Sequence, residues 1–186
     1  MSKLFVDEIV HQSSQGSGTI TIGASGETIN VVGTLQNNGS AVGGVMTPAF
    51  HAGRVGSGQT ISNYTQTEVI FDTERFDTNS CYNNSNGRFT PTVAGKYFVY
   101  TSLTLASINA VYSEIRLVKN LTTNISFGRH FNDIGYQSSF THGIIELNGT
   151  TDYVSVFTYH EDSVSRDIYN QSQGEASYFG AYKIIE

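Results

Sequence analysis

Short segments in which polar and apolar residues alternate recur along most of the chain. From residue 49 onward they occupy residues 49–52, 67–71, 96–105, 113–118, 124–131, 140–147, 153–159 and 177–185. Because successive side chains of a strand point to opposite faces, each segment predicts a strand with one buried face. The intervening segments, such as residues 83–87 and 148–152, are rich in asparagine or glycine, which favours tight turns. No helical periodicity intervenes, so the pattern predicts an all-β sandwich or jelly roll.

Three of the predicted strands carry large side chains on both faces. In residues 96–105, one face has the apolar set and the other has Phe98 and Tyr100. The apolar set is Tyr97, Val99, Leu103 and Leu105. Because aromatic side chains are common at subunit contacts, we expect one face to fill the core and the other to contact a second subunit. The expected contact residues are Phe98, Tyr100, Phe157, Tyr159 and Phe179. The alternative is a larger monomeric sandwich in which loops cover these faces.

Residues 1–47 differ from the rest and predict an N-terminal arm that precedes a head domain of residues 48–186. A Ser/Gly-rich hinge at 13–18 is followed by two similar β-like segments at 19–22 and 28–31, and residues 37–44 resemble a flexible linker. Two short strands are not stable alone in water, so their apolar face must be buried against copies of the chain or a partner. The expected anchoring side chains are Phe5, Ile9, Ile20, Ile22, Ile29 and Val31. A loose terminal tail is the alternative.

The charge and the cysteine content narrow the possible partners. Ten basic against sixteen acidic residues give a net charge of −6, which argues against a nucleic-acid partner. The single cysteine, Cys81, excludes an intrachain disulfide and favours synthesis in a reducing cytosol. No segment has the pattern of a signal peptide or the length of a membrane span, so we expect no membrane insertion.

The sequence contains little that points to catalysis. It has no Gly-x-Ser-x-Gly elbow, Walker loop, dinucleotide fingerprint or His-Glu-x-x-His motif. A carbohydrate-active enzyme would need paired carboxylates, and nothing in the spacing of the candidates selects a pair. These candidates are Glu114, Glu146, Asp152 and Asp162. We therefore predict no catalytic residues, no cofactor and no enzymatic activity.

The sequence also gives little indication of a metal site. The histidines are His11, His51, His130, His142 and His160. They have no ligand spacing, although three copies of one residue could meet on a threefold axis. Residues 160–162 could hold calcium together with Asp152, but a solvated turn is the simpler interpretation, so we predict no metal site. Cys81 is interpreted as incidental rather than reactive.

A series of motifs follows in order along residues 48–186. The series is Ala-Phe at 49–50, Val-Ile-Phe at 69–71, Gly-Arg-Phe-Thr-Pro at 87–91, Ala-Gly-Lys-Tyr-Phe-Val-Tyr at 94–100, Ile-Arg-Leu-Val-Lys-Asn at 115–120, Gly-Ile-Ile-Glu-Leu at 143–147, Asp-Tyr-Val-Ser-Val at 152–156 and Ser-Tyr-Phe-Gly-Ala-Tyr at 177–182. Together they resemble the globular domain of complement component 1q, one of the tumour-necrosis-factor-like trimeric jelly rolls. The resemblance implies a ten-stranded, two-sheet jelly roll that forms a homotrimer and binds through exposed loops. It also implies that Tyr97 and Val99 are buried within the subunit.

The arm departs from the animal members of that family, which carry a secretion signal and often a collagen stalk. It looks like the N-terminal segments of trimeric fibre, spike and decoration proteins of tailed phages. We therefore expect a non-enzymatic virion structural protein, made in the host bacterial cytoplasm and displayed on the virion surface. The arm would bind the major capsid protein or a tail component, and the head would bind a host surface glycan or protein.

Three roles remain open, two of them within the virion and one outside it. A capsid decoration protein, of the cement or head-fibre type, is favoured because an arm of about 47 residues provides no long shaft. A tail-fibre or tail-tip receptor-binding protein is the first alternative. A free lectin or cytokine-like ligand, which acts in solution, is the second.

Overall fold

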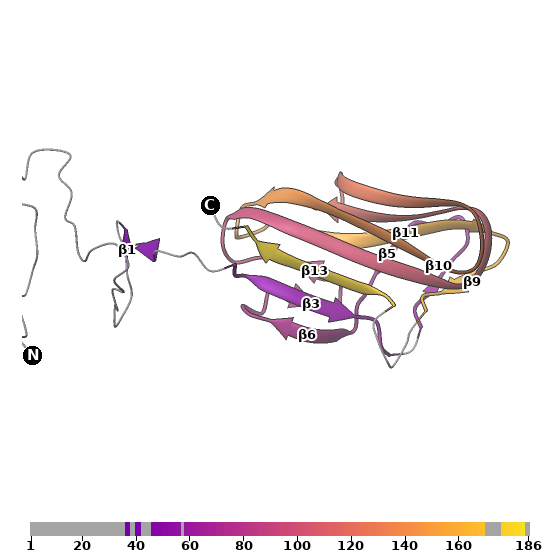
Figure 1. Ribbon diagram of the computed structural model, residues 1–186, viewed down its shortest axis with the longest axis horizontal. Helices are drawn as coiled ribbons and strands as arrows, with labels where there is room; N and C mark the ends of the chain where they lie inside the picture. Colours follow the sequence, from indigo (N-terminus) through magenta and orange to yellow (C-terminus); the bar gives the residue numbers. More distant parts are fainter. Residues whose placement is uncertain (1–35, 38–39, 42–45, 57, 170–175, 185–186) are drawn as a thin grey trace, which may run out of the picture. The chain divides into compact units, whose positions relative to one another are not determined.

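Two long strands, β9 (Gly95–Lys119) and β10 (Thr123–Leu147), pass through both layers of a β-sandwich in the computed structural model (Figure 1). They pair with each other in antiparallel fashion along almost their whole length, from Gly95↔Leu147 to Lys119↔Thr123. A register shift between Gly135 and Gln137 marks the region in which both strands bend from one layer to the other. The sequence predicted four separate strands here. The ladder instead continues through the bend, because a local irregularity absorbs the change of direction.

The structure describes residues 36–37, 40–41, 46–56, 58–169 and 176–184. The chain divides into two units, residues 1–43 and residues 44–186. In the first unit, β1 (Gln36–Asn37) and β2 (Ser40–Ala41) form a small hairpin where the sequence predicted a flexible linker. The predicted anchoring residues lie outside the described residues, so their role stays a prediction. They are Phe5, Ile9, Ile20, Ile22, Ile29 and Val31.

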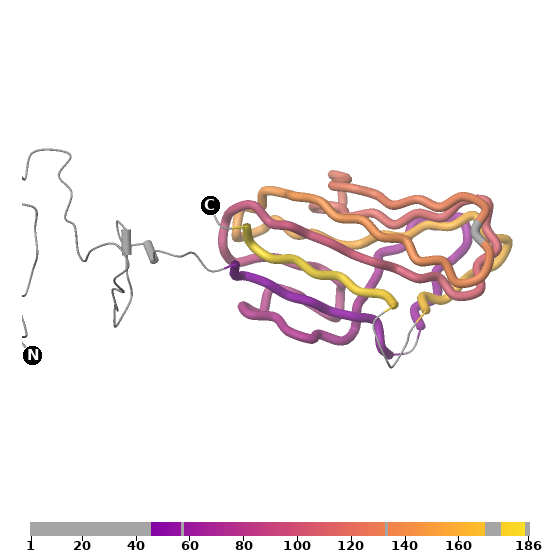
Figure 2. Tube along the Cα trace, viewed as in Figure 1, coloured from indigo at the N-terminus to yellow at the C-terminus, as the bar shows by residue number. Residues whose placement is uncertain are grey.

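The first layer is built on the first half of β9. Its strands, in spatial order and all antiparallel, are β6 (Thr73–Asp77), β3 (Ala49–Gly53), β13 (Tyr178–Lys183), β9 and the second half of β10. The tube view shows that the indigo start and the yellow end of the head lie at the same end of the sandwich, opposite the bends of β9 and β10 (Figure 2). A hydrogen bond from Lys183 N to Pro48 O joins these two chain ends, at 3.1 Å.

The second layer is built on the other half of β9, between the first half of β10 and β11 (Val154–Asp162). Short strands extend it beyond β11, namely β5 (Thr67–Val69), β8 (Arg88–Phe89) and β7 (Tyr82–Asn83). A separate pair, β4 (Thr60–Ile61) and β12 (Arg166–Asp167), lies outside this ladder. The described residues contain no helix, and the all-β jelly roll predicted from the alternation is confirmed.

Apolar side chains from both layers form the core between them. Tyr97 and Val99 are fully buried, as predicted. Phe50 lies at the centre of a ring cluster, with centroids 4.7 Å from Tyr82, 4.6 Å from Phe89 and 4.9 Å from Phe179. Such clusters supply much of the hydrophobic stabilisation of a small domain.

Phe179 was predicted to lie at a subunit contact, and that prediction was wrong. Its side chain is fully buried inside the single subunit, against Phe50 and Phe71. The reason is the alternation of β13, in which Phe179 and Ala181 face the core while Tyr178 and Tyr182 remain partly exposed.

Candidate functional site

Aromatic rings from five strands cover the outer surface of the first layer, which we call the aromatic face. Its members are His51, Phe76, Phe98, Tyr100, Phe140, His142, Tyr178 and Tyr182. The strand register explains why they gather. Phe98 pairs with Tyr182 on β13 and with Ile144 on β10, and the next outward residue, Tyr100, pairs with Gly180 and His142. Residues paired in adjacent strands share a face, so the rings form rows across the sheet.

Tyr100 occupies the middle of the aromatic face and is held from two sides. Its ring covers Gly180, which has no side chain to displace it. Its hydroxyl lies 3.1 Å from Nδ1 of His51, within hydrogen-bond distance. The predicted contact residues Phe98 and Tyr100 therefore lie together, with centroids 6.0 Å apart, and belong to a larger ring surface than the sequence indicated.

The aromatic face leaves apolar groups in water when the subunit is alone. Phe76 is 50% exposed, Phe140 52% and Ile144 60%. More apolar side chains are exposed elsewhere along β10, namely Phe127, Phe131, Ile134 and Tyr136. In the described part of the chain β10 pairs only with β9, so its other edge presents unpaired backbone groups. An exposed edge with large apolar side chains favours contact with another chain.

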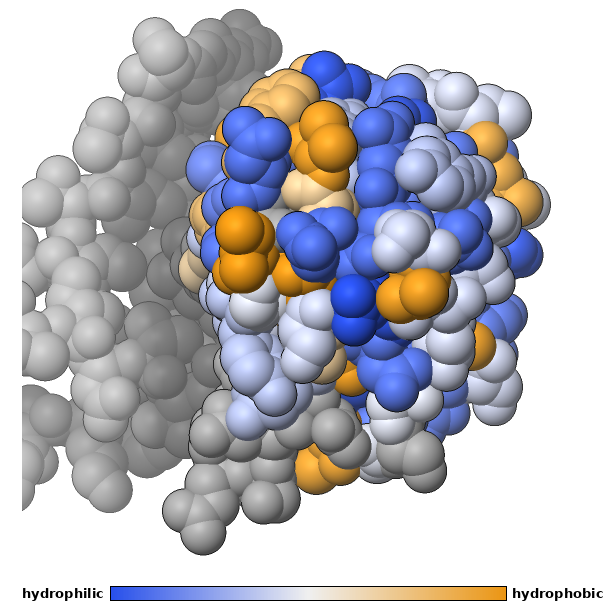
Figure 3. Space-filling view, turned by 90° about the vertical axis from the view of Figure 1, so that its right-hand side faces the viewer, coloured by the Kyte–Doolittle hydropathy of each residue, from blue (hydrophilic) through white to orange (hydrophobic). Residues whose placement is uncertain are grey.

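The end of the sandwich at the bends of β9 and β10 has a different surface. Hydrophobic patches there are small and separated by hydrophilic ones (Figure 3). A shallow hollow of about 180 Å³ at this end is lined in part by Val111, Asn132 and Ile134. The apolar surface is therefore not continuous over this end of the molecule.

Phe157 and Tyr159 were predicted to share the contact with Phe98 and Tyr100, but the structure places them on a different surface. They belong to β11, whose inward residues Val154 and Val156 fill the core. Phe157 and Tyr159 consequently face outward from the second layer, while Phe98 faces outward from the first. The sequence could not show this, because it does not reveal which layer each strand joins.

The outer surface of the second layer has an ionic cluster that the sequence analysis missed. Arg116 Nε and Arg129 Nε both donate hydrogen bonds to the Glu114 carboxylate, and so does the Tyr112 hydroxyl. The Glu114 side chain is only 1% exposed. Register brings the groups together, because Glu114 pairs with Arg129 on β10 and with Tyr159 on β11. We call Tyr112, Glu114, Arg116 and Arg129 the Glu114 cluster.

Aromatic rings surround this cluster. The Arg129 guanidinium carbon lies 4.0 Å from the Phe127 ring centroid and 5.8 Å from that of Tyr112. Such cation–π contacts hold a guanidinium in place without neutralising it. With two arginines and one glutamate, the cluster keeps one net positive charge.

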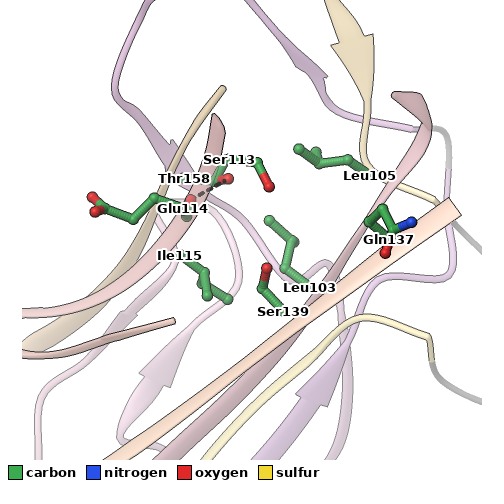
Figure 4. A pocket seen from close by; sticks show the side chains of 8 residues that line it. All are labelled: Leu103, Leu105, Ser113, Glu114, Ile115, Gln137, Ser139 and Thr158. Atoms are coloured by element: carbon green, nitrogen blue, oxygen red, sulfur yellow. Dashed lines mark hydrogen bonds between the residues drawn. The ribbon is translucent and has the colours of Figure 1, made fainter. Parts of the chain in front are cut away.

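A small cavity between the layers offers no room for a ligand. Its volume is about 10 Å³, enough for at most one water molecule (Figure 4). Polar groups of Ser113, Ser139 and Thr158 line it together with leucine side chains. The Thr158 hydroxyl donates to the Glu114 backbone carbonyl at 2.9 Å, and the Glu114 carboxylate points away from the cavity (Figure 4).

The carboxylates considered for catalysis have separate partners. Asp152 forms an ion pair with Lys119 at 2.8 Å and accepts hydrogen bonds from Asn120 and from the Asn148 backbone N–H, which hold its pKa below the usual value. Glu146 and Asp152 both line a surface hollow at the end of β10. A general acid needs a raised pKa, so this arrangement favours a structural role for Asp152.

Asp162 is buried at the other end of β11. Burial alone would raise its pKa, but hydrogen bonds from Arg166 and from the Asn109 and Val164 backbone N–H groups outweigh it and lower the pKa. Asp152 precedes β11 and Asp162 ends it, so by strand geometry they lie roughly 25 Å apart. The calcium site considered for Asp152 with residues 160–162 does not form.

The histidines and the cysteine have separate environments. His160 is fully buried, with Nε2 3.1 Å from Ile61 O, and its Nδ1 accepts a hydrogen bond from Asp162 N. His51 and His142 lie on the aromatic face. Among the described residues no three His, Cys, Asp or Glu side chains are grouped to hold a metal. Burial raises the pKa of the Cys81 thiol, which disfavours the reactive thiolate.

Comparisons with known proteins agree with this architecture. Residues 49–184 match the family described as C1q domain. A comparison with curated proteins returned no match. Similar solved structures include the globular domain of zebrafish complement 1qA protein, with 17% identity and a TM-score of 0.56 over 75% of this chain and 98% of that one. The crystal structure of murine APRIL at pH 5.0 has 13% sequence identity and a TM-score of 0.55, and the match covers 73% of this chain and 98% of that one. The structure of Eiger TNF from S. frugiperda has 14% identity and a TM-score of 0.54, and the match covers 74% of this chain and 92% of that one. At these identities the solved structures share the fold alone. No helix in the described part of the chain could cross a membrane.

Proposed function

This chain belongs to the C1q domain family. We propose that it is a non-enzymatic, homotrimeric binding and structural protein, and that it forms part of a tailed-phage virion. The main support for a trimer is that the same subunit has two exposed surfaces, the aromatic face and the apolar edge of β10 that pairs with no described strand. A single copy leaves both in water, and association with further copies would bury them.

The two surfaces differ from each other, so they support a head-to-tail contact rather than a symmetric dimer. When such contacts close, they form a ring of subunits. The TNF-like jelly rolls that this sequence resembles close as trimers. In the proposed assembly the β10 edge of one subunit covers the aromatic face of the next, with Phe98 and Tyr100 buried at that contact.

The proposed attachment to a virion rests on the sequence of residues 1–47. Their hinge and their repeated β-like segments favour an anchor, and the single cysteine favours synthesis in a reducing cytosol. In this proposal the arm binds the major capsid protein, and the protein decorates the capsid with its head outward. Attachment to a tail component is the alternative within the virion.

The trimer is tested on the full-length chain by light scattering coupled to size exclusion. The expected mass is three times the 20.3 kDa of one chain. A monomer that stays stable at micromolar concentration would overturn the proposed interface.

The location is tested on purified particles by quantitative mass spectrometry and electron cryo-microscopy. Hundreds of copies per particle support capsid decoration, whereas a few dozen or fewer support a tail position. Removal of residues 1–47 should abolish particle association and leave the trimer intact. A free lectin-like or cytokine-like ligand would instead be absent from particles and keep its binding after that deletion.

A further inference from the structure

A polar hollow of about 210 Å³ opens on the outer surface of the second layer, beside the Glu114 cluster. The tip of the β9–β10 hairpin contributes Thr122 and Asn124, β11 contributes Phe157, and Gln66 precedes β5. Arg116 and Val118 of β9 complete most of the lining. All of these residues come from one subunit, so the hollow does not require the trimer.

Arg116 is fixed in place while most of its donors remain available. Its Nε donates to Glu114, and the side chain is 29% exposed. No described residue accepts a hydrogen bond from its two Nη groups. Because Arg129 and Tyr112 also hold Glu114, the guanidinium is anchored to a rigid support. A fixed guanidinium with free N–H groups is suited to bind a carboxylate through two parallel hydrogen bonds.

The rest of the lining divides into an apolar part and a polar part. Phe157 pairs with Arg116 in the strand register, so the two side chains lie on the same face of the sheet, and both line the hollow. Val118 adds a second apolar group, and the Gln66 and Asn124 amides and the Thr122 hydroxyl supply donors and acceptors. A pyranose ring has the matching character, with a C–H surface for the aromatic ring and hydroxyls for the amides.

We propose that this hollow binds one acidic sugar residue, a pyranose that carries a carboxylate, as in a uronic acid. The carboxylate binds Arg116, and the C–H surface of the ring packs on Phe157. The volume lies below the roughly 300–1,000 Å³ of pockets for drug-sized ligands, which limits the occupant to about one ring. The inference rests on the binding role proposed for the head, and its ligand is an acidic polysaccharide rather than a protein.

The test is a titration of the full-length protein with sodium glucuronate, followed by NMR or calorimetry at low salt. Glucose serves as the control without a carboxylate, and sodium acetate as the control without a sugar ring. We expect glucuronate to bind at least about tenfold more tightly than either control. Equal binding of glucose would overturn the role of Arg116, equal binding of acetate would indicate an adventitious ion only, and no glucuronate binding below about 50 mM would overturn the site.

Matched arginine variants localise the binding. Arg116→Lys keeps the charge but removes the planar fork, so we expect at least about a tenfold loss of glucuronate affinity. Arg88→Lys is the control, because Arg88 has a similar exposure of 30% and also binds a glutamate through Nε, at 3.2 Å from Glu68, but does not line the hollow. A loss in Arg88→Lys as large as in Arg116→Lys would overturn the assignment.

Two further variants keep the test decisive if Arg116→Lys fails to fold. Gln66 is exposed, and Gln66→Ala should fold normally and weaken glucuronate binding about threefold or more. Phe157→Leu keeps an apolar group but removes the ring, and should weaken glucuronate without changing acetate binding. Wild-type affinity in both variants would overturn the site. The mass of each sample is measured in parallel, so a monomer that binds glucuronate contradicts only the trimer, and a trimer that does not bind contradicts only this inference.

Discussion

Tyr100 lies directly over Gly180, so closely that a Cβ atom added at Gly180 would be 2.4 Å from the Tyr100 ring. The two residues are register partners on β9 and β13, at the centre of the aromatic face. Gly180 thus gives the ring a place to lie flat against the sheet. The position of Tyr100, and with it the shape of the proposed subunit contact, depends on the absence of a side chain at residue 180.

Gly180→Ala is therefore expected to displace the Tyr100 ring and to break its hydrogen bond with His51. Overpacking of this kind costs about 1–3 kcal/mol, and here the cost falls on a surface that the trimer would bury. Light scattering should show a weaker trimer, with dissociation at a higher protein concentration than in the wild type. Gly58→Ala is the control. A Cβ atom at residue 58 would lie 3.3 Å from its nearest neighbours, which belong to Asp167 and Ile168 and not to the aromatic face. Equal trimer stability in both variants would contradict the proposed role.

Phe98→Asp tests the same surface more severely. Phe98 packs against Tyr182 at 5.4 Å and His142 at 5.5 Å between centroids, so a carboxylate there would be buried at the subunit contact without a partner. We expect a soluble monomer or an unfolded chain in light scattering and circular dichroism. Val164→Asp, at an exposed residue beyond β11, should leave the trimer unchanged. An unaltered Phe98→Asp trimer would remove Phe98 from the interface.

The fold could be predicted from the sequence because alternation in a half-buried strand follows directly from burial on one face. Tyr97 and Val99 show this well, since both are fully buried as expected. Alternation did not identify the inward face where both faces carry large residues. In β13 either face could have been the inward one. In the structure Gly180 faces outward under the Tyr100 ring, so its neighbour Phe179 faces the core.

The candidate site depended on strand pairing, which the sequence does not specify. Glu114 and Arg129 are opposite charges on adjacent predicted strands, and only their register makes them partners. A search for alternating charged and aromatic residues in neighbouring strands could have detected the cluster. Phe157 was assigned to the wrong surface for the same reason, because the sequence does not assign β11 to a layer.

Glu114→Gln tests whether the Glu114 cluster stabilises the subunit. The substitution removes the one negative charge between Arg116 and Arg129, which leaves two arginines without their shared partner. Loss of one member of a buried ion pair costs several kcal/mol, and because both arginines are partly exposed we expect about 2–4 kcal/mol. Urea denaturation measures this change. Glu74→Gln, at an exposed residue of β6, should change stability little, and an equal effect of the two substitutions would contradict the prediction.

The stability of the head should fall in acid, in large part because of Asp162. Its folded pKa is lowered, since the hydrogen bonds from Arg166, Asn109 N and Val164 N outweigh the effect of burial. A carboxyl group with a lower pKa in the folded state stabilises that state above its unfolded pKa of about 3.9. The stabilisation is therefore full above about pH 5 and is lost progressively as the pH falls through the folded pKa.

Asp162→Asn should remove this contribution. The amide cannot form the ion pair with Arg166 at 2.7 Å, so we expect a loss of about 2–3 kcal/mol at pH 7 and a smaller loss at pH 3. Urea denaturation at pH 7, 5, 4 and 3 measures the difference between variant and wild type. The stability of the variant should still depend on pH to some extent because of Asp72. Burial would raise the pKa of Asp72, but the Val55 and Gly56 backbone N–H groups, the Thr73 hydroxyl and Arg54 lower it. The difference between variant and wild type should therefore shrink towards low pH, because protonation of Asp162 in the unfolded chain below about pH 4 reduces the stabilisation that the ionised carboxylate provides. A difference that stays constant from pH 7 to pH 3 would show that Asp162 stabilises the fold by packing rather than by its charge.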